Sequence, residues 1–175
     1  MGASSQPSRR ELKPEEFREL FLQEVHAAAD ELFSGVKPSF APRREVDDVE
    51  FRSAGMVGFV SSTFQGSIVV AIKGLESLRT RLYEDWVGEL ANQLSGRVKN
   101  RLLRHRLPPY DVSPQVTIRG RELEPTRRSA DETLCYCSSS PAGDCCIWVT
   151  LVVRDTVPLA PHADPPETEG SVILF

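Results

Sequence analysis

Apolar residues recur at helical spacing in a first long segment, from about Lys13 to Phe33. Proline suits the first turn of a helix, and Pro14 stands there, while Gly35 follows the last apolar position as a stop signal. The apolar positions are Phe17, Leu20, Phe21, Val25, Ala28 and Leu32. The spacing predicts an amphipathic helix that packs on a sheet.

A second helical pattern begins after Gly74 and continues to about Arg106. The pattern weakens near Tyr83 and Glu84, where we allow a break. The sequence "LPP" at 107–109 ends the helix, because proline lacks a backbone N–H and disfavours helical geometry in the residue before it.

Shorter apolar runs predict strands. The runs at 49–62 and 67–73 flank "TFQG" (63–66) and indicate a hairpin, and 113–123 reads as a further strand. A second hairpin follows and ends at about Val153. Two helices with these strands predict an α+β fold, in which long helices pack on a mostly antiparallel sheet.

Two glycines interrupt the first of these strands. Gly55 and Gly58 indicate a bulge or a close approach of another backbone. The chain contains neither G-x-G-x-x-G nor G-K-[ST], so the glycines give no support to a nucleotide site.

The polarity of the chain ends suggests three parts. Residues 1–12 are polar and are predicted to be disordered. Residues 13–154 form a single domain in this interpretation, and 155–175 form a proline-rich acidic tail that ends in the apolar sequence "SVILF".

Composition limits the classes of partner. The chain has 175 residues, of which 40% are hydrophobic and 26% charged, with a net charge of -4. This balance is typical of a globular protein and gives no general attraction to nucleic acid or to an anionic membrane. No apolar run reaches the roughly 20 residues of a membrane span, and the first residues contain no apolar signal region, so we predict a cytoplasmic protein.

Four cysteines lie close together at Cys135, Cys137, Cys145 and Cys146. The predicted hairpin brings Cys137 roughly opposite Cys145, which makes a zinc site or a disulfide conceivable. The spacing lacks the usual C-x2-C pairs, adjacent cysteines of a strand point to opposite faces, and cytosolic thiols stay reduced. We therefore expect buried, reduced cysteines and assign no metal site.

Polar and small residues follow one edge of the second helix: Asp85, Glu89, Asn92, Gly96 and Lys99. At about 100° per residue they fall within roughly 40° of Asp85. The apolar residues, Trp86 included, fall on the opposite side and are expected in the core. Glu89 and Asn92, three residues apart, therefore point together into solvent.

The chemistry of this pair is limited. The carboxamide of Asn92 does not take up a proton near neutral pH, but it can donate and accept hydrogen bonds and so orient a water molecule. The carboxylate of Glu89 can pair with a cation on a partner. The pair fits best if another molecule supplies the rest of the site; the alternative is that both are ordinary solvated helix residues.

The wider pattern resembles a known family. D-x3-E-x2-N at Asp85, Glu89 and Asn92, within "DWVGELANQLSGRVKNRL", is similar to the signature helix of the CheC/CheX/FliY chemotaxis phosphatases, in its CheX-like single-site form. The hairpin "GMVGFV…FQGSIVVAI" and the strand "SPQVTIRG" resemble that family too, so the likeness covers about Val49 to Val153. It implies long helices on an antiparallel sheet and hydrolysis of the aspartyl phosphate of a CheY-like response regulator.

By this resemblance, Asn92 would orient the attacking water and Glu89 would meet a lysine of the regulator. Asp85, Gly96 and Lys99 would contact the partner together with Glu89. The phosphorylated regulator would bring its own Mg²⁺, so this chain would bind no cofactor. The family also implies a homodimer. The alternative is a non-catalytic CheX-like module that binds a receiver domain or scaffolds a signalling complex.

Overall fold

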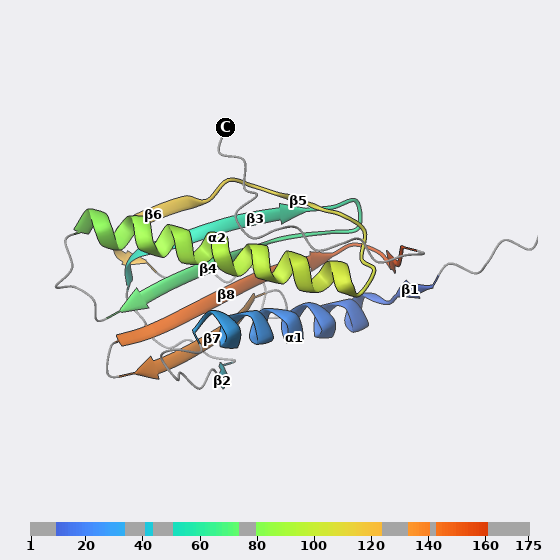
Figure 1. Ribbon diagram of the computed structural model, residues 1–175, viewed down its shortest axis with the longest axis horizontal. Coiled ribbons are helices and arrows are strands. Elements are labelled where there is room, and N and C mark those ends of the chain that lie inside the picture. The colour runs from blue at the N-terminus through green and yellow to red at the C-terminus, as the bar shows by residue number, and fades with distance from the viewer. Residues whose placement is uncertain are drawn as a thin grey trace, which may run out of the picture.

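Two helices and a large antiparallel sheet make up most of the molecule (Figure 1). The computed structural model describes residues 10–33, 41–43, 51–73, 80–123, 133–140 and 143–160. Neither helix carries an apolar stretch long enough to cross a membrane.

Helix α1 comprises Pro14–Leu32, which confirms the first predicted helix. Its start is stabilised by Glu16, whose side chain accepts a hydrogen bond of 2.8 Å from the backbone N–H of Lys13. The acidic residues of this first turn also interact favourably with the positive end of the helix dipole. Phe33 ends the helix, and its N–H still bonds to the carbonyl oxygen of Ala29.

Helix α2 comprises Thr80–Arg104 and is continuous, so the break allowed near Tyr83 is absent. The helix ends two residues before the predicted position at Arg106. This residue has a φ of 64°, a left-handed conformation that closes helices, and its N–H bonds to the carbonyl oxygen of Leu103. The two prolines at 108 and 109 follow this closing turn.

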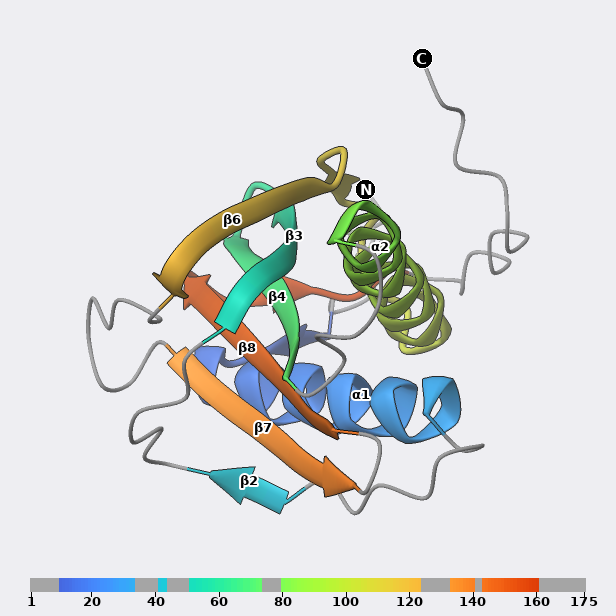
Figure 2. The same ribbon diagram turned by 90° about the vertical axis from the view of Figure 1, so that its left-hand side faces the viewer.

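The main sheet is antiparallel throughout. Its strands are β2 (Ala41–Arg43), β3 (Phe51–Val60), β4 (Phe64–Lys73), β5 (Asp111–Val112), β6 (Val116–Leu123), β7 (Thr133–Ser140) and β8 (Gly143–Val153). The order is β2-β7-β8-β4-β3, and both β5 and β6 pair with the free edge of β3. Figure 2 shows β6 at one edge and β2 at the other. The predicted α+β fold with a mostly antiparallel sheet is confirmed.

The turn between β3 and β4 comprises residues 61–63, earlier than the predicted 63–66. The hydroxyl of Ser61 accepts hydrogen bonds from the N–H groups of Thr63 (3.2 Å) and Phe64 (3.1 Å). These bonds complete the turn within residues 61–63. Strand β4 therefore begins at Phe64, three residues before the predicted start at residue 67.

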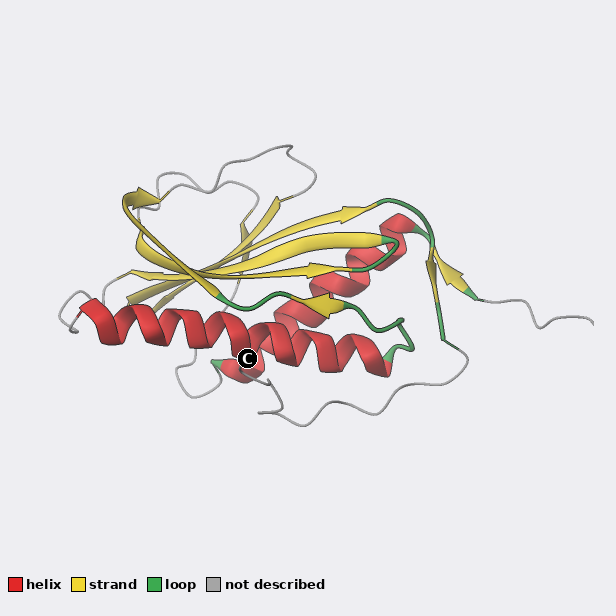
Figure 3. Cartoon of the chain, turned by 90° about the horizontal axis from the view of Figure 1, so that it is seen from above, coloured by secondary structure: helices red, strands yellow, loops and turns green. Residues whose placement is uncertain are grey.

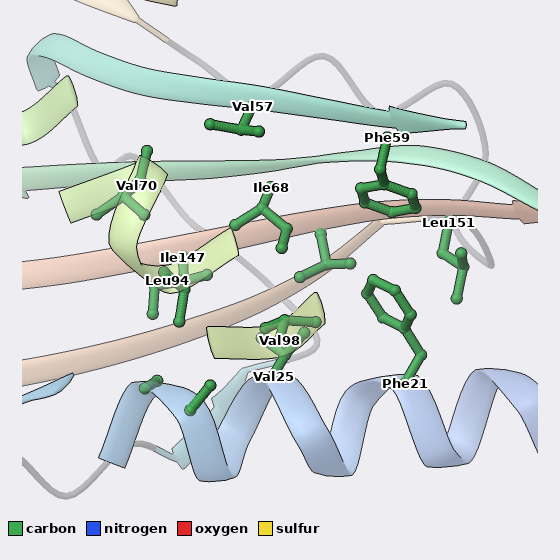
Figure 4. Close-up of a cluster of buried hydrophobic side chains, with 14 of the residues drawn as sticks. Phe21, Val25, Val57, Phe59, Ile68, Val70, Leu94, Val98, Ile147 and Leu151 are labelled. Atoms are coloured by element: carbon green, nitrogen blue, oxygen red, sulfur yellow. The ribbon is translucent and has the colours of Figure 1, made fainter. Parts of the chain in front are cut away.

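Both helices lie on the same side of the sheet (Figure 3). Along each strand, alternate residues face the helices and form the core, as the period of two requires. Figure 4 shows Leu94 and Val98 of α2, Phe21 and Val25 of α1, and Ile147 of β8 as members of one buried cluster. All five side chains are essentially inaccessible to solvent. Helix α2 is thus fixed to the sheet by its apolar side.

A small second sheet joins the two ends of the described chain. Strand β1 (Glu11–Leu12) pairs with β9 (Val157–Pro158), and Val157 is fully buried in the core. Strand β1 thus lies before residue 13 and β9 after residue 154, just outside the range predicted for the domain. Two-residue strands carry no periodicity that the sequence could reveal. The rest of the predicted N-terminal and C-terminal segments lies outside the described residues.

The cysteine hairpin exists, but its register differs by one residue from the prediction. Cys137 lies across from Cys146, not from Cys145. Cys145 is a buried, reduced thiol, as expected, whereas Cys146 is disulfide-bonded, which corrects the expectation that all four cysteines are reduced. The side chains of Cys135 and Cys137 lie outside the described residues.

Candidate functional site

Helix α2 has one buried and one exposed side. The buried side carries Val87, Leu90, Ala91, Leu94, Val98 and Leu102. Of the five residues predicted to form the polar edge, Asp85, Glu89 and Gly96 are exposed, and Asn92 and Lys99 are half-buried. The structure therefore places all five on one helix, and none of them is fully buried.

Trp86 does not lie in the core. It is 41% exposed, which corrects the expectation from the sequence. At about 100° per residue, the buried residues of α2 are centred more than a quarter turn away from Trp86. The error arose because the tryptophan stands at the margin of the apolar arc, where its hydrophobic character alone favoured burial.

The first half of α2 lies very close to strand β3. A Cβ atom added at Gly55 would lie 2.4 Å from the carbonyl oxygen of Val87 and 2.9 Å from Cα of Gly88. A Cβ at Gly88 would in turn lie 3.0 Å from the hydroxyl of Thr117. Glycine is needed at position 55 because the two backbones approach within the space of a side chain, whereas the contacts at Gly88 are with side chains and are less severe. The predicted close approach at Gly55 is confirmed, and it fixes the helix next to Glu89.

The same half of the helix is tied to strand β6 by an ion pair. Glu84 is 3% exposed, and its carboxylate pairs with the guanidinium of Arg119. Burial of a carboxylate is costly unless a cation or hydrogen bonds compensate for the lost water. Arg119 therefore allows Glu84 to face the sheet, one residue before the exposed Asp85, and so helps to set the rotation of α2.

Glu89 has a hydrogen-bond partner on its own helix. The side-chain amide of Gln93 donates to Oε1 of Glu89 at 2.9 Å. Residues four apart on a helix lie on neighbouring turns, so this bond restricts the rotamers of Glu89 without burying it. The second carboxylate oxygen is left to meet a group outside the helix.

The surface beyond Asn92 is open. Asn92 lies one turn after Glu89, and Gly96 one turn after Asn92. A Cβ atom added at Gly96 would meet nothing within 4 Å. This glycine therefore leaves room beside the amide, whereas Gly55 and Gly88 serve packing within the chain.

The second half of α2 uses its charges within the molecule. Arg97 pairs with Glu31 of α1 at 2.7 Å, and Arg101 pairs with Glu31 at 3.1 Å and with Glu24 at 3.2 Å. Nε2 of His105 lies 2.8 Å from Glu24. Burial lowers the pKa of Arg101, but the hydrogen bonds and charges of the two glutamates outweigh this and raise it above its ordinary value. The basic end of α2 thus binds α1.

Metal-binding residues are not gathered at this site. In the part of the chain that the structure describes, no group of three or more histidine, cysteine, aspartate or glutamate side chains is placed to hold a metal ion. The site consists of a carboxylate pair, an amide pair and an exposed indole on one rigid helix.

Sequence reasoning missed three contributors. Gln93 could have been found from its spacing of four residues after Glu89. Glu84 and Arg119 lie far apart in the sequence, and only the strand register and the helix rotation bring them together. No sequence signal identifies such a pair in advance.

Comparison with other sequences gives no relative. No protein-family model matches the chain, and no curated protein sequence matches it.

Comparison with solved structures gives clear matches. The CheX chemotaxis protein of Vibrio vulnificus is 20% identical, with a TM-score of 0.63 over 75% of this chain and 99% of that chain. A CheX–CheY–BeF3–Mg²⁺ complex from Borrelia burgdorferi matches with 17% identity and a TM-score of 0.58, over 79% of this chain and 98% of that chain. FliY of Thermotoga maritima matches with 13% identity and a TM-score of 0.50, over 81% and 91%.

These matches cover nearly the whole length of the other chains. At such low identity they show the fold alone: the protein has the fold of the CheC/CheX/FliY chemotaxis proteins. The resemblance that the D-x3-E-x2-N helix suggested is therefore confirmed at the level of fold.

Proposed function

We propose that this protein is a phosphatase that hydrolyses the aspartyl phosphate of a CheY-like response regulator. The observation that carries the proposal is the placement of Asp85, Glu89 and Asn92 on the solvent side of a helix anchored to a sheet of this fold. A protein of the same fold has been solved in complex with CheY, which supports a regulator as the partner.

Asn92 is the proposed catalytic residue. Its amide can accept from and donate to a water molecule and hold it in line with the phosphorus atom, although it cannot remove a proton. Phosphoryl transfer needs mainly positioning of the nucleophile and stabilisation of charge, so a water-orienting group is a sufficient contribution from this chain. The half-burial of Asn92 restricts its motion and favours that role.

Glu89 is the proposed docking carboxylate. It is exposed, and the bond from Gln93 holds one oxygen, so the other can pair with a lysine of the regulator. Asp85, Gly96 and Lys99 border this pair and are proposed partner contacts. The regulator would bring the aspartyl phosphate and Mg²⁺, which screens charge on the phosphoryl group.

A non-catalytic receiver-binding module is the second candidate. Asp85, Trp86, Glu89 and Gln93 are all more exposed than Asn92. These four residues would suffice for docking without any turnover, and the same fold would then serve to scaffold a signalling complex.

The test is phosphate release from phosphorylated CheY-like receivers in the presence of Mg²⁺. We expect the wild-type protein to accelerate release and Asn92→Ala to lose about a hundredfold of that acceleration, because the water is no longer positioned. Asn100→Ala is the matched control, since Asn100 is a half-buried asparagine two turns further along the same helix. Binding without acceleration by the wild-type protein would favour the docking module instead.

A further inference from the structure

Three large apolar side chains are substantially exposed in the described part of the chain: Val60, Trp86 and Val116. Trp86 is the largest of them and the one that lies on helix α2. The residues around it follow the amphipathic pattern, since Val87 is fully buried and Leu90 nearly so. Among the side chains of α2 that the structure describes, from residue 84 onward, Trp86 is therefore a local exception to the burial of large apolar residues.

Trp86 is part of the proposed site surface. It follows Asp85 directly and precedes Glu89 by three residues, so its indole lies about one helical turn from the Glu89 carboxylate. Gln93 continues the same exposed side. Among the described residues, the indole has no aromatic partner, and its N–H has no hydrogen-bond acceptor. Nothing within the described fold therefore accounts for a tryptophan at this position.

We propose that Trp86 is the apolar anchor with which this protein binds its receiver domain, and that it determines which receivers are accepted. This inference rests on the proposed function. A receiver that brings its phosphoryl group to Asn92 and a lysine to Glu89 must also cover the adjoining turn of α2, where Trp86 stands.

The composition of this surface specifies the chemistry of the partner. Asp85 and Glu89 place two carboxylates on one side of the indole, along the polar edge of α2. The complementary receiver surface carries an apolar patch bordered by basic side chains. Tryptophan is enriched among the residues that dominate binding energy, because a large rigid ring loses little entropy when it is covered. A receiver with polar or acidic residues at this patch would leave the indole poorly packed and would be rejected.

The experiment separates binding from turnover. Dissociation constants are measured against a panel of CheY-like receivers treated with beryllium fluoride and Mg²⁺, and phosphate release is measured with the same receivers in phosphorylated form. For Trp86→Ala we expect Kd and KM to rise about tenfold or more, as for the loss of an interface anchor. The kcat should stay within about twofold, because the group that orients water is unchanged.

Two variants serve as controls. Trp86→Phe keeps an aromatic ring and should retain most of the affinity for the preferred receiver. Val60→Ala removes a similarly exposed apolar side chain at the far end of β3, which lies away from the start of α2 in Figure 1, and should leave Kd unchanged. Trp86→Ala should show wild-type helical content, because the ring is not part of the core.

The possible failures are distinguishable. If Trp86→Ala binds every receiver as well as wild type does, the anchor is overturned, even if Asn92→Ala still abolishes acceleration. If wild type binds but never accelerates release, the phosphatase is overturned, and a weaker Kd for Trp86→Ala still supports the anchor. If no receiver binds wild type, both proposals fail.

Discussion

Apart from Glu84, which pairs with Arg119, the charged residues in the two halves of helix α2 are used in opposite ways. In the second half, Arg97 and Arg101 pair with glutamates of α1, and just past the end of the helix His105 contacts Glu24 as well. In the first half, Asp85 and Glu89 are exposed, and among the described residues neither forms an ion pair. A single helix thus combines a structural half and a half whose functional groups face outward.

The means of attachment differ as well. The second half contacts α1 through buried apolar side chains such as Val98 and through the long side chains of its arginines. The first half lies directly against β3 through Gly55 and Gly88, with no side chain between the backbones. A short, rigid contact limits movement of the neighbouring residues, and a site that must meet a reacting group benefits from such precision. The half with the exposed groups is also the half with the tighter backbone contact.

The strongest test of this difference is Gly55→Ala. The added methyl group would overlap the carbonyl oxygen of Val87, so the first half of α2 must move away from the sheet. Overpacking of this kind costs about 1–3 kcal/mol of unfolding free energy. Denaturant titration measures the loss, and we expect phosphate release to fall together with stability.

Gly96→Ala is the matched control for this variant. Its Cβ meets nothing, and alanine is preferred over glycine inside a helix by up to about 1 kcal/mol, so the variant should be more stable than wild type. Equal stability of Gly55→Ala and wild type would show that the tight contact does not constrain the first half.

A smaller effect is expected from Glu24→Ala. The change removes the carboxylate that Arg101 and His105 share, and partly exposed ion pairs contribute about 1 kcal/mol or less. Unfolding free energy should fall by about that amount at low salt, and by less at high salt because ions screen the interaction. Receiver binding should be unaffected, since this network serves the structural half.

Glu19→Ala provides the comparison for Glu24→Ala. Glu19 is an exposed glutamate of the same helix, with no ion pair among the described residues. If both variants have equal stability across salt concentrations, the charges of the second half do not stabilise the helix pair.

The smallest effect is expected from Gln93→Ala. The variant frees the Glu89 carboxylate, and side-chain pairs at this helical spacing contribute about 0.2–0.5 kcal/mol. We expect roughly a twofold weaker Kd for a receiver treated with beryllium fluoride, because the carboxylate loses its fixed orientation. A tighter Kd would indicate instead that Gln93 competes with the partner for Glu89.

The spacing of apolar residues in the sequence was enough to predict the longer helices and strands. Both long helices, the β3–β4 hairpin and β6 were found in this way, and so was the polar edge of α2. The close approach at Gly55 was predicted because a glycine inside a strand often marks a place where another backbone comes near. These features leave a local signal in the sequence, either a repeating pattern or an interrupting glycine.

The sequence did not reveal features that depend on strand register, on the exact rotation of a helix, or on contacts between distant elements. Trp86 stands where the buried and exposed arcs meet, so a rotation of the helix by a few tens of degrees decides its environment. The predicted register of the cysteine hairpin was off by one residue, because the sequence does not define the length of its turn clearly. The pair of Glu84 with Arg119 requires two elements placed correctly in three dimensions.

The pairing of β1 with β9 has a practical consequence for handling the protein. The N–H of Leu159 bonds to the carbonyl oxygen of Arg10, and the N–H of Ala160 bonds to that of Arg106, at the end of α2. The described chain therefore enters and leaves the domain side by side. In Figure 1 this point lies at the opposite end of the molecule from the start of α2. Fluorescent reporters or surface tethers attached there would leave the face around Asn92 unobstructed, and the whole unit suits insertion into a loop of a host protein.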